Sequence, residues 1–317
     1  MPHWLLKACT QKVISWLPRS DSLNYVFQKH VTKTARLRPE WFDHKIDQAA
    51  RHLRNWDKAE HQGRPHRAIE LGTGWHPVVP IALGLAGVDE VLSVDRSNLV
   101  RAAKVSAVLR MFIEAADDGR LAERLKVQRP DRLEIIRSLA ADPEIAAARL
   151  ADLGVAFLVG DARGTDLPAA SINLFTSNNT FEHIPPDVLL DILVEMRRLA
   201  APGAVLSHFV DLSDHYSHFD GSLSPYNFLR YSDSQWRLLN NRLVFQNRLR
   251  VPGYRRLFSA AGLDLVDEDG YTPQPVADIE SLRLPAALRD QSASDVLVTQ
   301  AWFTAVVGAR PRARQHP

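Results

Sequence analysis

The sequence has one cysteine, Cys9, among its 317 residues. A single cysteine excludes an intrachain disulfide and a cysteine-based metal cluster, which fits a reducing compartment, so we expect a cytoplasmic protein. No apolar run approaches the roughly 20 residues that a transmembrane helix needs. Lys7 and Lys12 interrupt the short apolar run at the start of the chain. That run predicts an amphipathic helix, which packs on the core or, less commonly, lies on a membrane surface.

A large excess of charge of one sign is also absent. The chain has 39 Lys and Arg against 37 Asp and Glu, a formal net charge of +2. This balance gives no strong electrostatic attraction to nucleic acid, and we expect no nucleic-acid partner. The composition, 45% hydrophobic and 24% charged, is that of an ordinary globular protein. The composition does not indicate which oligomeric state the protein has.

Apolar strand patterns alternate with helical periodicity after the first 66 residues. This alternation predicts a parallel sheet covered by helices on both faces. Strands are expected at 68–71, 90–95, 155–161, 171–179, 204–210, 263–270 and 295–308, and helices at 77–87, 97–115, 185–200 and 252–261. In the helix at 185–200, five apolar residues recur at helical spacing, so we expect them to face the core. They are Leu189, Ile192, Leu193, Met196 and Leu199.

The remaining segments set the expected domain organisation. Residues 1–66 are predicted to be helical and to act as a lid on a catalytic domain at 67–310, because no linker separates the two. The Ala- and Arg-rich stretch at 116–153 interrupts the alternation and predicts a helical insertion. Residues 211–250 lack a clear period and are expected to complete the acceptor site. Residues 311–317 form a basic tail.

A third glycine is missing from the turn after the first strand. The stretch "ELGTGWHP" has Gly72 and Gly74, but Pro77 occupies the third position of a G-x-G-x-x-G pattern. Such a turn lets the backbone approach a ligand closely at the edge of a parallel sheet. Dinucleotides usually use the third glycine and place a pyrophosphate on the helix N-terminus. The pattern therefore favours a ligand without phosphate, such as S-adenosylmethionine (SAM).

Further segments at strand ends support this interpretation. "SVDRS" ends the second strand at Asp95, which can accept hydrogen bonds from ribose hydroxyls or cap the next helix. Together with "ELGTGWHP", "VGDA" and "SINLFTSNNTFEHIP", it makes residues 66–210 resemble the class I SAM-dependent methyltransferases. The resemblance implies a Rossmann-like α/β fold with a seven-stranded, mostly parallel sheet. It also implies SAM as the cofactor and S-adenosylhomocysteine (SAH) as the product.

The resemblance implies a set of cofactor-binding residues. Glu70 would lie near the charged methionine end, Asp161 would take the adenine amino group, and Ala162 would lie beside the ring. The full expected set is Glu70, Gly72, Thr73, Gly74, Asp95, Arg96, Asp161, Ala162 and Asn178. Trp75, His76 and Pro77 depart from simpler family members, which have a small residue there.

His183 is the leading candidate for a catalytic residue. The resemblance places the "EHI" segment, Glu182 to Ile184, beside the methyl donor. A base is needed only if the acceptor must lose a proton, as a hydroxyl must. The alternative, held nearly equal, is that His183 closes the loop through hydrogen bonds.

A second group of polar residues follows the fifth strand. The stretch "SHFVDLSDHYSHFD" contains His208, Asp211, Asp214, His215, His218 and Asp220. Histidine and carboxylate ligands are able to hold a divalent metal that lowers the pKa of a hydroxyl. The spacing matches no defined signature, so we expect no metal and predict hydrogen bonds to a polar acceptor or plain loop structure. The expected substrate-binding residues are His208, Asp211, His215, His218 and Tyr226.

The sequence thus predicts methyl transfer from SAM to a small-molecule or polar metabolite acceptor. Oxygen is weakly favoured over nitrogen because of the histidines. Two alternatives remain. An NAD(P)-dependent oxidoreductase shares the strand, turn and acid, although the sequence offers no recognisable hydride-transfer machinery after the glycine turn. A non-catalytic SAM-binding protein would share the fold without the chemistry.

Overall fold

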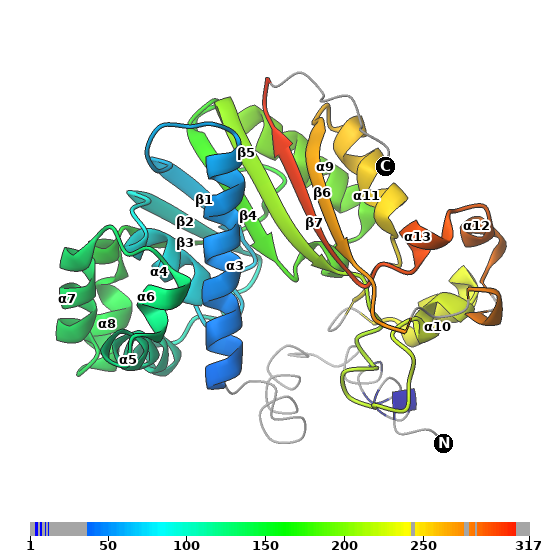
Figure 1. Ribbon diagram of the computed structural model, residues 1–317, viewed down its shortest axis with the longest axis horizontal. Coiled ribbons are helices and arrows are strands. Elements are labelled where there is room, and N and C mark those ends of the chain that lie inside the picture. Colours follow the sequence, from blue (N-terminus) through cyan, green and yellow to red (C-terminus); the bar gives the residue numbers. More distant parts are fainter. Residues whose placement is uncertain are drawn as a thin grey trace.

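The computed structural model describes residues 37–241, 245–275, 279–282 and 284–308, together with Trp4, Leu5, Lys7, Thr10 and Lys12. Its centre is a seven-stranded sheet of order β3-β2-β1-β4-β5-β7-β6 (Figure 1). The pairs among β1 to β5 are parallel, whereas β7 is antiparallel to both β5 and β6. The predicted seven-stranded, mostly parallel Rossmann-like fold is confirmed.

The elements follow the predicted alternation. The strands are β1 (Arg67–Leu71), β2 (Glu90–Asp95), β3 (Val155–Val159), β4 (Ile172–Asn178), β5 (Ala200–Asp211), β6 (Leu265–Tyr271) and β7 (Gln300–Val306). The longer helices are α3 (Pro39–Lys58), α4 (Val78–Leu85), α5 (Ala102–Asp117), α9 (Pro186–Leu199) and α11 (Val251–Ala260). The shorter ones are α6 (Arg120–Arg124), α7 (Pro130–Leu139), α8 (Pro143–Ala148), α10 (Asp233–Leu239), α12 (Ala286–Arg289) and α13 (Ala293–Val296).

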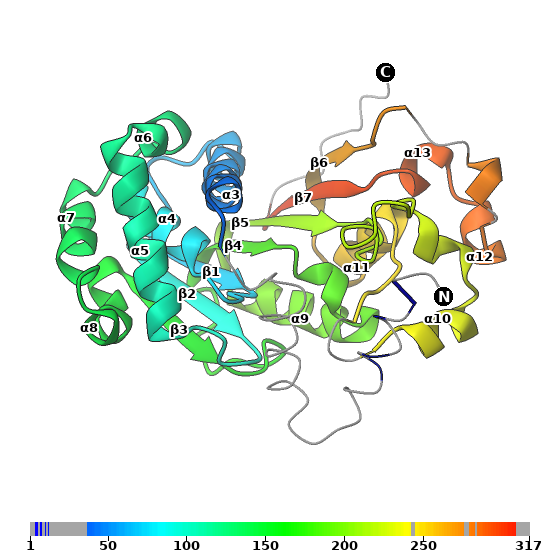
Figure 2. The same cartoon turned by 90° about the horizontal axis from the view of Figure 1, so that it is seen from below.

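The sheet separates two hydrophobic cores because neighbouring residues of a strand point to opposite faces. In β4, Leu174 packs with α3, α4 and α5 on one face, and Phe175 packs with α9 and α11 on the other. The five apolar residues expected to form the core side of α9 are all buried there. Figure 2 shows α4 to α8 gathered beside β1 to β3, with α10 and α12 at the opposite end of the molecule.

Helix α3 is the longest part of the expected lid that the structure describes, and it packs into the core. Phe42, Ile46 and Leu53 are buried beneath α4 and against the sheet. Lys45, Gln48 and His52 fall at i, i+3 and i+7, so they share a face of the helix. Most of residues 1–36, and the basic tail at 311–317, lie outside the described residues.

The stretch at 116–153 is helical, as predicted, and forms α6, α7, α8 and a short 3₁₀ turn at Leu150–Leu153. The helix expected from residue 97, however, begins at Ala102. The carboxylate of Asp95 accepts a hydrogen bond from the Ser97 amide at 2.9 Å, which holds the intervening chain as a loop. Similarly, the last strand begins at Gln300 and not at 295, because Ser292 caps the short helix α13.

The segment at 211–250 contains α10 and a 3₁₀ turn at Asn227–Arg230. Its aromatic residues form a third hydrophobic cluster with the chain that leads into β7. Arg250 is buried and donates to the carbonyls of Leu212, Val296 and Val298, which joins the two ends of the segment. No helix in the described part of the chain is long and apolar enough to cross a membrane.

Candidate functional site

The glycine turn lies at the carboxyl edge of the sheet, between β1 and α4. Gly72 and Gly74 both have left-handed backbones, with φ of 84° and 63°. A Cβ on Gly72 would collide with the side chain of Thr180, whereas a Cβ on Gly74 would meet nothing within 4 Å. Gly72 is therefore needed for packing inside the protein. Gly74 faces open space, where a ligand can approach the backbone.

The start of α4 is unsuited to a phosphate group. Pro77 precedes the helix and Pro80 lies in its first turn, and neither has a backbone N–H. Phosphate sites at helix N-termini use such N–H groups. The turn thus favours a ligand without a pyrophosphate, as the sequence predicted.

Asp95 ends β2 beside this turn. Its carboxylate accepts from the backbone N–H of Gly74 at 3.1 Å and from that of Ser97 at 2.9 Å. Each oxygen therefore has one protein donor, and a carboxylate oxygen accepts more than one hydrogen bond. Arg96, the next residue, is exposed and carries positive charge toward Asp161. The structure accordingly leaves Asp95 able to accept from a ligand.

Glu70 and Thr73 belong to a buried polar chain beneath the turn. The hydroxyl of Ser93 donates to Glu70 at 2.6 Å and lies 2.5 Å from the hydroxyl of Thr73. Burial raises the pKa of Glu70 to about 7, although the Ser93 hydrogen bond and Lys45 oppose this. Glu70 is thus a carboxyl whose charge changes near neutral pH.

Asp161 and Ala162 follow β3 on the other side of Asp95. The guanidinium of Arg163 binds both carboxylate oxygens of Asp161, with an Nη2 to Oδ2 distance of 2.6 Å. These hydrogen bonds lower the pKa of Asp161 to about 2. Asp161 is exposed and already paired, whereas Ala162 is half-buried against the core. A ligand amino group at Asp161 would compete with Arg163.

A cavity of about 120 Å³ opens beside Asp95. Thr73 and Ser93 line it from the turn, and apolar residues line the rest. The apolar residues are Leu99, Val100, Val105, Ala147, Leu150, Phe157, Leu158 and Val159. The loop before α5 and the helical insertion thus supply part of its wall.

Asn178 ends β4 and binds a residue that the sequence interpretation missed. The Oδ1 atom of Asn178 is 3.1 Å from Nε2 of His52, and Nδ1 of His52 is 2.8 Å from the hydroxyl of Ser207. His52 is buried, which lowers its pKa to about 3. The polar face of α3 at Lys45, Gln48 and His52 was visible in the helical spacing. It is the signal that would have found this contact.

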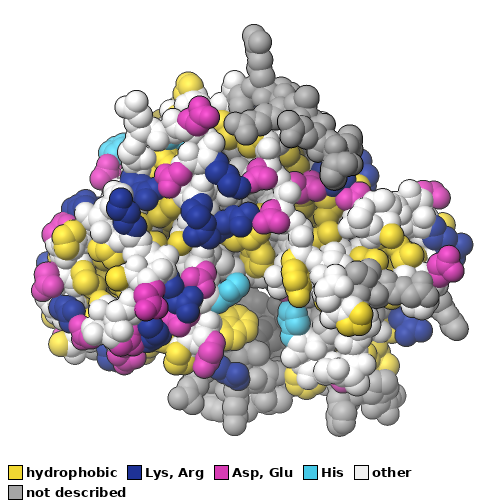
Figure 3. Space-filling view, in the orientation of Figure 1, with side chains coloured by type: hydrophobic (Ala, Val, Ile, Leu, Met, Phe, Trp, Pro, Cys, Tyr) yellow, Lys and Arg dark blue, Asp and Glu magenta, His cyan; other side chains and the backbone are white. Residues whose placement is uncertain are grey.

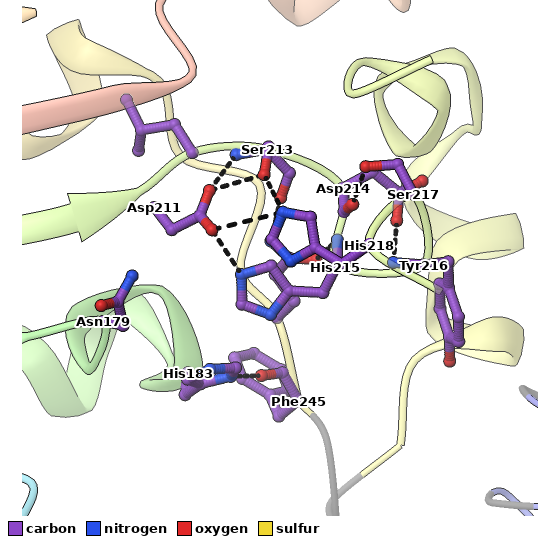
Figure 4. Close-up of polar contacts among 12 residues, drawn as sticks. Asn179, His183, Asp211, Ser213, Asp214, His215, Tyr216, Ser217, His218 and Phe245 are labelled. Atoms are coloured by element: carbon purple, nitrogen blue, oxygen red, sulfur yellow. Dashed lines mark hydrogen bonds and ion pairs between the residues drawn. The ribbon is translucent and has the colours of Figure 1, made fainter. Parts of the chain in front are cut away.

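His183 lies in a 3₁₀ turn, Phe181–His183, after β4 (Figure 4). Its Nδ1 is 2.7 Å from the carbonyl oxygen of Phe245, so Nδ1 carries the proton in the neutral ring. Nε2 is then the atom that accepts a proton or binds a cation. Desolvation lowers the pKa of His183, and the Phe245 contact opposes this. The neutral form therefore prevails at pH 7.

Three of the predicted acceptor residues form a group with His183. The rings of His183 and His215 are 4.9 Å apart, and His218 stacks on His215 at 5.4 Å. Nε2 of each of His215 and His218 lies 3.6 Å from Oδ2 of Asp211. In the surface drawn in Figure 3, histidine side chains are visible at separate places in the lower middle of the molecule.

The other members of the predicted acceptor group do not join it. His208 is fully buried within β5, where it stacks on Phe181 at 4.3 Å and contacts the Ser177 hydroxyl. The hydroxyl of Tyr226 is buried and donates to the carbonyl of Leu297 at 2.7 Å. Asp214 is buried and accepts from the backbone N–H of Tyr216 and from Asn227, and Asp220 is a half-buried turn residue. These side chains build the fold around the site.

Glu182 was not among the predicted site residues, but it lies next to this group. Its side chain is 1% exposed, and neither carboxyl oxygen has a hydrogen-bond partner of good geometry. Burial raises its pKa well above the usual value. The amides of Glu182 and Asp211 lie near enough to oppose this, as does Lys45. The acceptor side thus contains a buried carboxyl with unused oxygens.

No protein-family model matches the sequence, and no curated protein matches it. Many solved structures have a similar fold. One, from Mesorhizobium loti, is an S-adenosylmethionine-dependent methyltransferase with 14% identity and a TM-score of 0.45, over 82% of this chain and 99% of that one.

A geranyl diphosphate C-methyltransferase from Streptomyces coelicolor A3(2) has 13% identity and a TM-score of 0.43, over 81% of this chain and 78% of that one. Its structure contains Mg²⁺, geranyl diphosphate and SAH. A chain from a Haloferax volcanii complex of the Trm112 activator and a methyltransferase has 16% identity and a TM-score of 0.42, over 87% of this chain and 97% of that one. Identities this low indicate a shared fold and no more.

Proposed function

We propose that this protein is an enzyme that transfers the methyl group of SAM to a small-molecule acceptor, with a hydroxyl oxygen favoured over nitrogen. The observation that carries the proposal is the pairing of two features at one sheet edge. The open backbone at Gly74 and the carboxylate of Asp95 lie at the ends of β1 and β2, and the histidine group lies beyond β4 and β5.

The residues of the turn fit the cofactor. Asp95 would accept the ribose hydroxyls, Gly74 would allow close approach, and Glu70 would lie under the methionine end. Asn178, Asp161 and Ala162 would complete the contacts. Bound SAM supplies a methyl group on a sulfonium sulfur, which leaves as a neutral thioether.

The histidine side would act on the acceptor. A hydroxyl oxygen that attacks the methyl carbon must release its proton, and Nε2 of His183 is an unprotonated acceptor in the tautomer that Phe245 favours. His215, His218 and Asp211 would hold the polar acceptor beside it. Alignment of oxygen and methyl group in a desolvated site would supply much of the rate.

Ligand binding tests the cofactor part directly. Calorimetry should show binding of SAH but not of NADH, and Gly74→Ala should weaken SAH binding about tenfold, equal to about 1.4 kcal/mol. Gly63→Ala is a matched control, because Gly63 also has a positive φ of 76° and open space at its Cβ. Equal SAH affinity in the two variants, or binding of NADH, would contradict the proposal.

A methylated product separates the enzyme from a non-catalytic SAM-binding protein. Incubation with methyl-labelled SAM and a panel of hydroxylated and amino metabolites should release SAH and label an acceptor. SAH binding without a labelled product across the panel would favour the non-catalytic alternative.

A further inference from the structure

Glu182, His183 and His215 converge from two separate segments. Each offers one ligand atom, and the three atoms lie within 4.8 Å of one another. Glu182 and His183 belong to the turn after β4. His215 comes from the segment after β5 and lies near His183 (Figure 4). Two ends of neighbouring strands thus bring one carboxyl and two imidazoles to a single point.

The carboxyl of Glu182 is the second, independent observation. A buried polar group without a hydrogen-bond partner costs folding free energy, and a buried charge costs more. Both of its oxygens lack a partner of good geometry, although the side chain is almost fully buried. A cation bound at this point would give these oxygens the partner that the protein does not supply.

We propose that Glu182, His183 and His215 form a binding site for a divalent transition-metal ion. Two imidazoles and one carboxylate suit Zn²⁺, Mn²⁺ or Fe²⁺ better than Mg²⁺ or Ca²⁺, which prefer oxygen ligands throughout. Three protein ligands leave positions open for an acceptor oxygen.

The surrounding residues orient the two imidazoles. The Phe245 carbonyl holds Nδ1 of His183 and so leaves Nε2 for the ion. Oδ2 of Asp211 lies 3.6 Å from Nε2 of His215, longer than a hydrogen bond, and would orient that ring once the distance shortens. Carboxylates and carbonyls commonly orient metal-binding histidines in this way.

Binding requires a small closure of the group. Ligand nitrogens lie about 2.1 Å from Zn²⁺, so two ligands of one ion are at most about 4.2 Å apart. Two ligand atoms at the 4.8 Å limit would therefore have to approach each other by about 0.6 Å. His183 and His215 are both partly exposed, so rotation of their rings is able to supply this shift.

This inference deepens the proposed function and rests on it for the role of the ion. A divalent ion would bind the acceptor oxygen and lower the pKa of its hydroxyl, so that the proton leaves to solvent before the oxygen attacks. Nε2 of His183 would then bind the ion and not take the proton. The sequence alone favoured a reaction without metal.

Metal binding is measured on the full-length protein, purified without a histidine tag and stripped with a chelator. Titration with Co²⁺, followed by visible absorption, should show one ion per chain. Glu182→Gln and His215→Ala should each weaken Co²⁺ binding by at least about tenfold, since even indirect partners of metal ligands cost 10–100-fold. His66→Ala is the control, because His66 is exposed, pairs with Asp89 and lies before β1 at the opposite sheet edge.

Thermal melts and SAH calorimetry accompany every variant. A folded Glu182→Gln or His215→Ala variant that keeps SAH affinity but loses Co²⁺ supports the site. Co²⁺ binding that is absent from the wild-type chain, or equal in His66→Ala and both site variants, overturns it. SAH binding in that case leaves the proposed function standing, whereas Co²⁺ binding without SAH binding removes the proposed function and keeps the metal site.

Discussion

At the β1–β2 end of the sheet edge, the carboxyls of Glu70 and Asp95 each accept hydrogen bonds from neighbouring residues. Across the edge, both oxygens of the buried Glu182 lack such a partner, and the rings of His183 and His215 lie in contact. The first region has its polar groups already positioned, and we expect it to receive the ligand. The second leaves the oxygens of Glu182 without partners, and we expect the reaction to take place there.

His183→Ala should have the largest effect, and it removes a side chain from the histidine end of the sheet edge only. We expect single-turnover methyl transfer to fall by roughly a hundredfold to ten-thousandfold, the usual result of losing a general base. SAH affinity should stay unchanged, because His183 lies across the edge from Asp95. A rate within a factor of a few of the wild type would instead make His183 a loop-closing residue.

Repeating this kinetic experiment with His215→Ala and a chelator distinguishes the two roles of the histidines. If His183 acts as a base, a chelator has no effect and His215→Ala is the milder variant. Chelator-sensitive turnover with equal damage from both substitutions would indicate that the two rings share an ion.

Glu70→Gln tests the β1–β2 end of the edge through the pH dependence of the free energy of unfolding. The folded-state pKa of about 7 exceeds the ordinary 4.5. The protonated form therefore contributes stability that is fully present below pH 4.5 and is lost as pH rises through about 7. At 1.36 kcal/mol per pKa unit, the contribution is about 3 kcal/mol. Gln accepts the same Ser93 hydrogen bond, so urea unfolding of the variant should lack this decline between pH 4.5 and 7.

A parallel decline in the free energy of unfolding of the wild type and of Glu70→Gln would contradict this prediction. Such a result would place the titration in another group, because Gln has no proton to lose in this range.

Asp95→Ala and Asp161→Ala give the smallest effects and compare two acids of the cofactor side. Losing hydrogen bonds from a charged acceptor costs about 1.5–3 kcal/mol, so Asp95→Ala should weaken SAH binding about tenfold to a hundredfold. Asp161→Ala should cost less, because Arg163 already occupies both oxygens. Calorimetry that ranks Asp161 above Asp95 would show that Arg163 moves aside for the ligand.

The sequence was enough to predict the sheet and the residues at its strand ends. The strand at 90–95 has the predicted bounds, and the glycine turn and Asp95 meet where parallel strands require. These features depend on local periodicity and on a rule of strand direction. The late start of α5 at Ala102 depends on the side chain of Asp95, which periodicity does not report.

The acceptor side was only partly predictable, because its contacts join distant segments. The alternation of β5 gives His208 the same side as Leu206, so its burial was readable from the strand pattern. The position of Glu182 against His215 was not readable, since a loop of irregular path brings His215 back to the strand end. Residues that such a loop brings together are not marked by any periodic pattern in the sequence.

The guanidinium of Arg250 has a consequence for how far the loop before it can be altered. Because Arg250 holds the Leu212 carbonyl, the loop between them begins and ends at one anchored point, as the hypervariable loops of an antibody do on their framework. Phe245 and Asn247 must be kept because they bond the turn after β4, whereas changes of composition between residues 219 and 239 would leave the sheet edge and the glycine turn in place. Under the proposed function, exchanging this part of the loop would change the acceptor while the methyl donor stays the same.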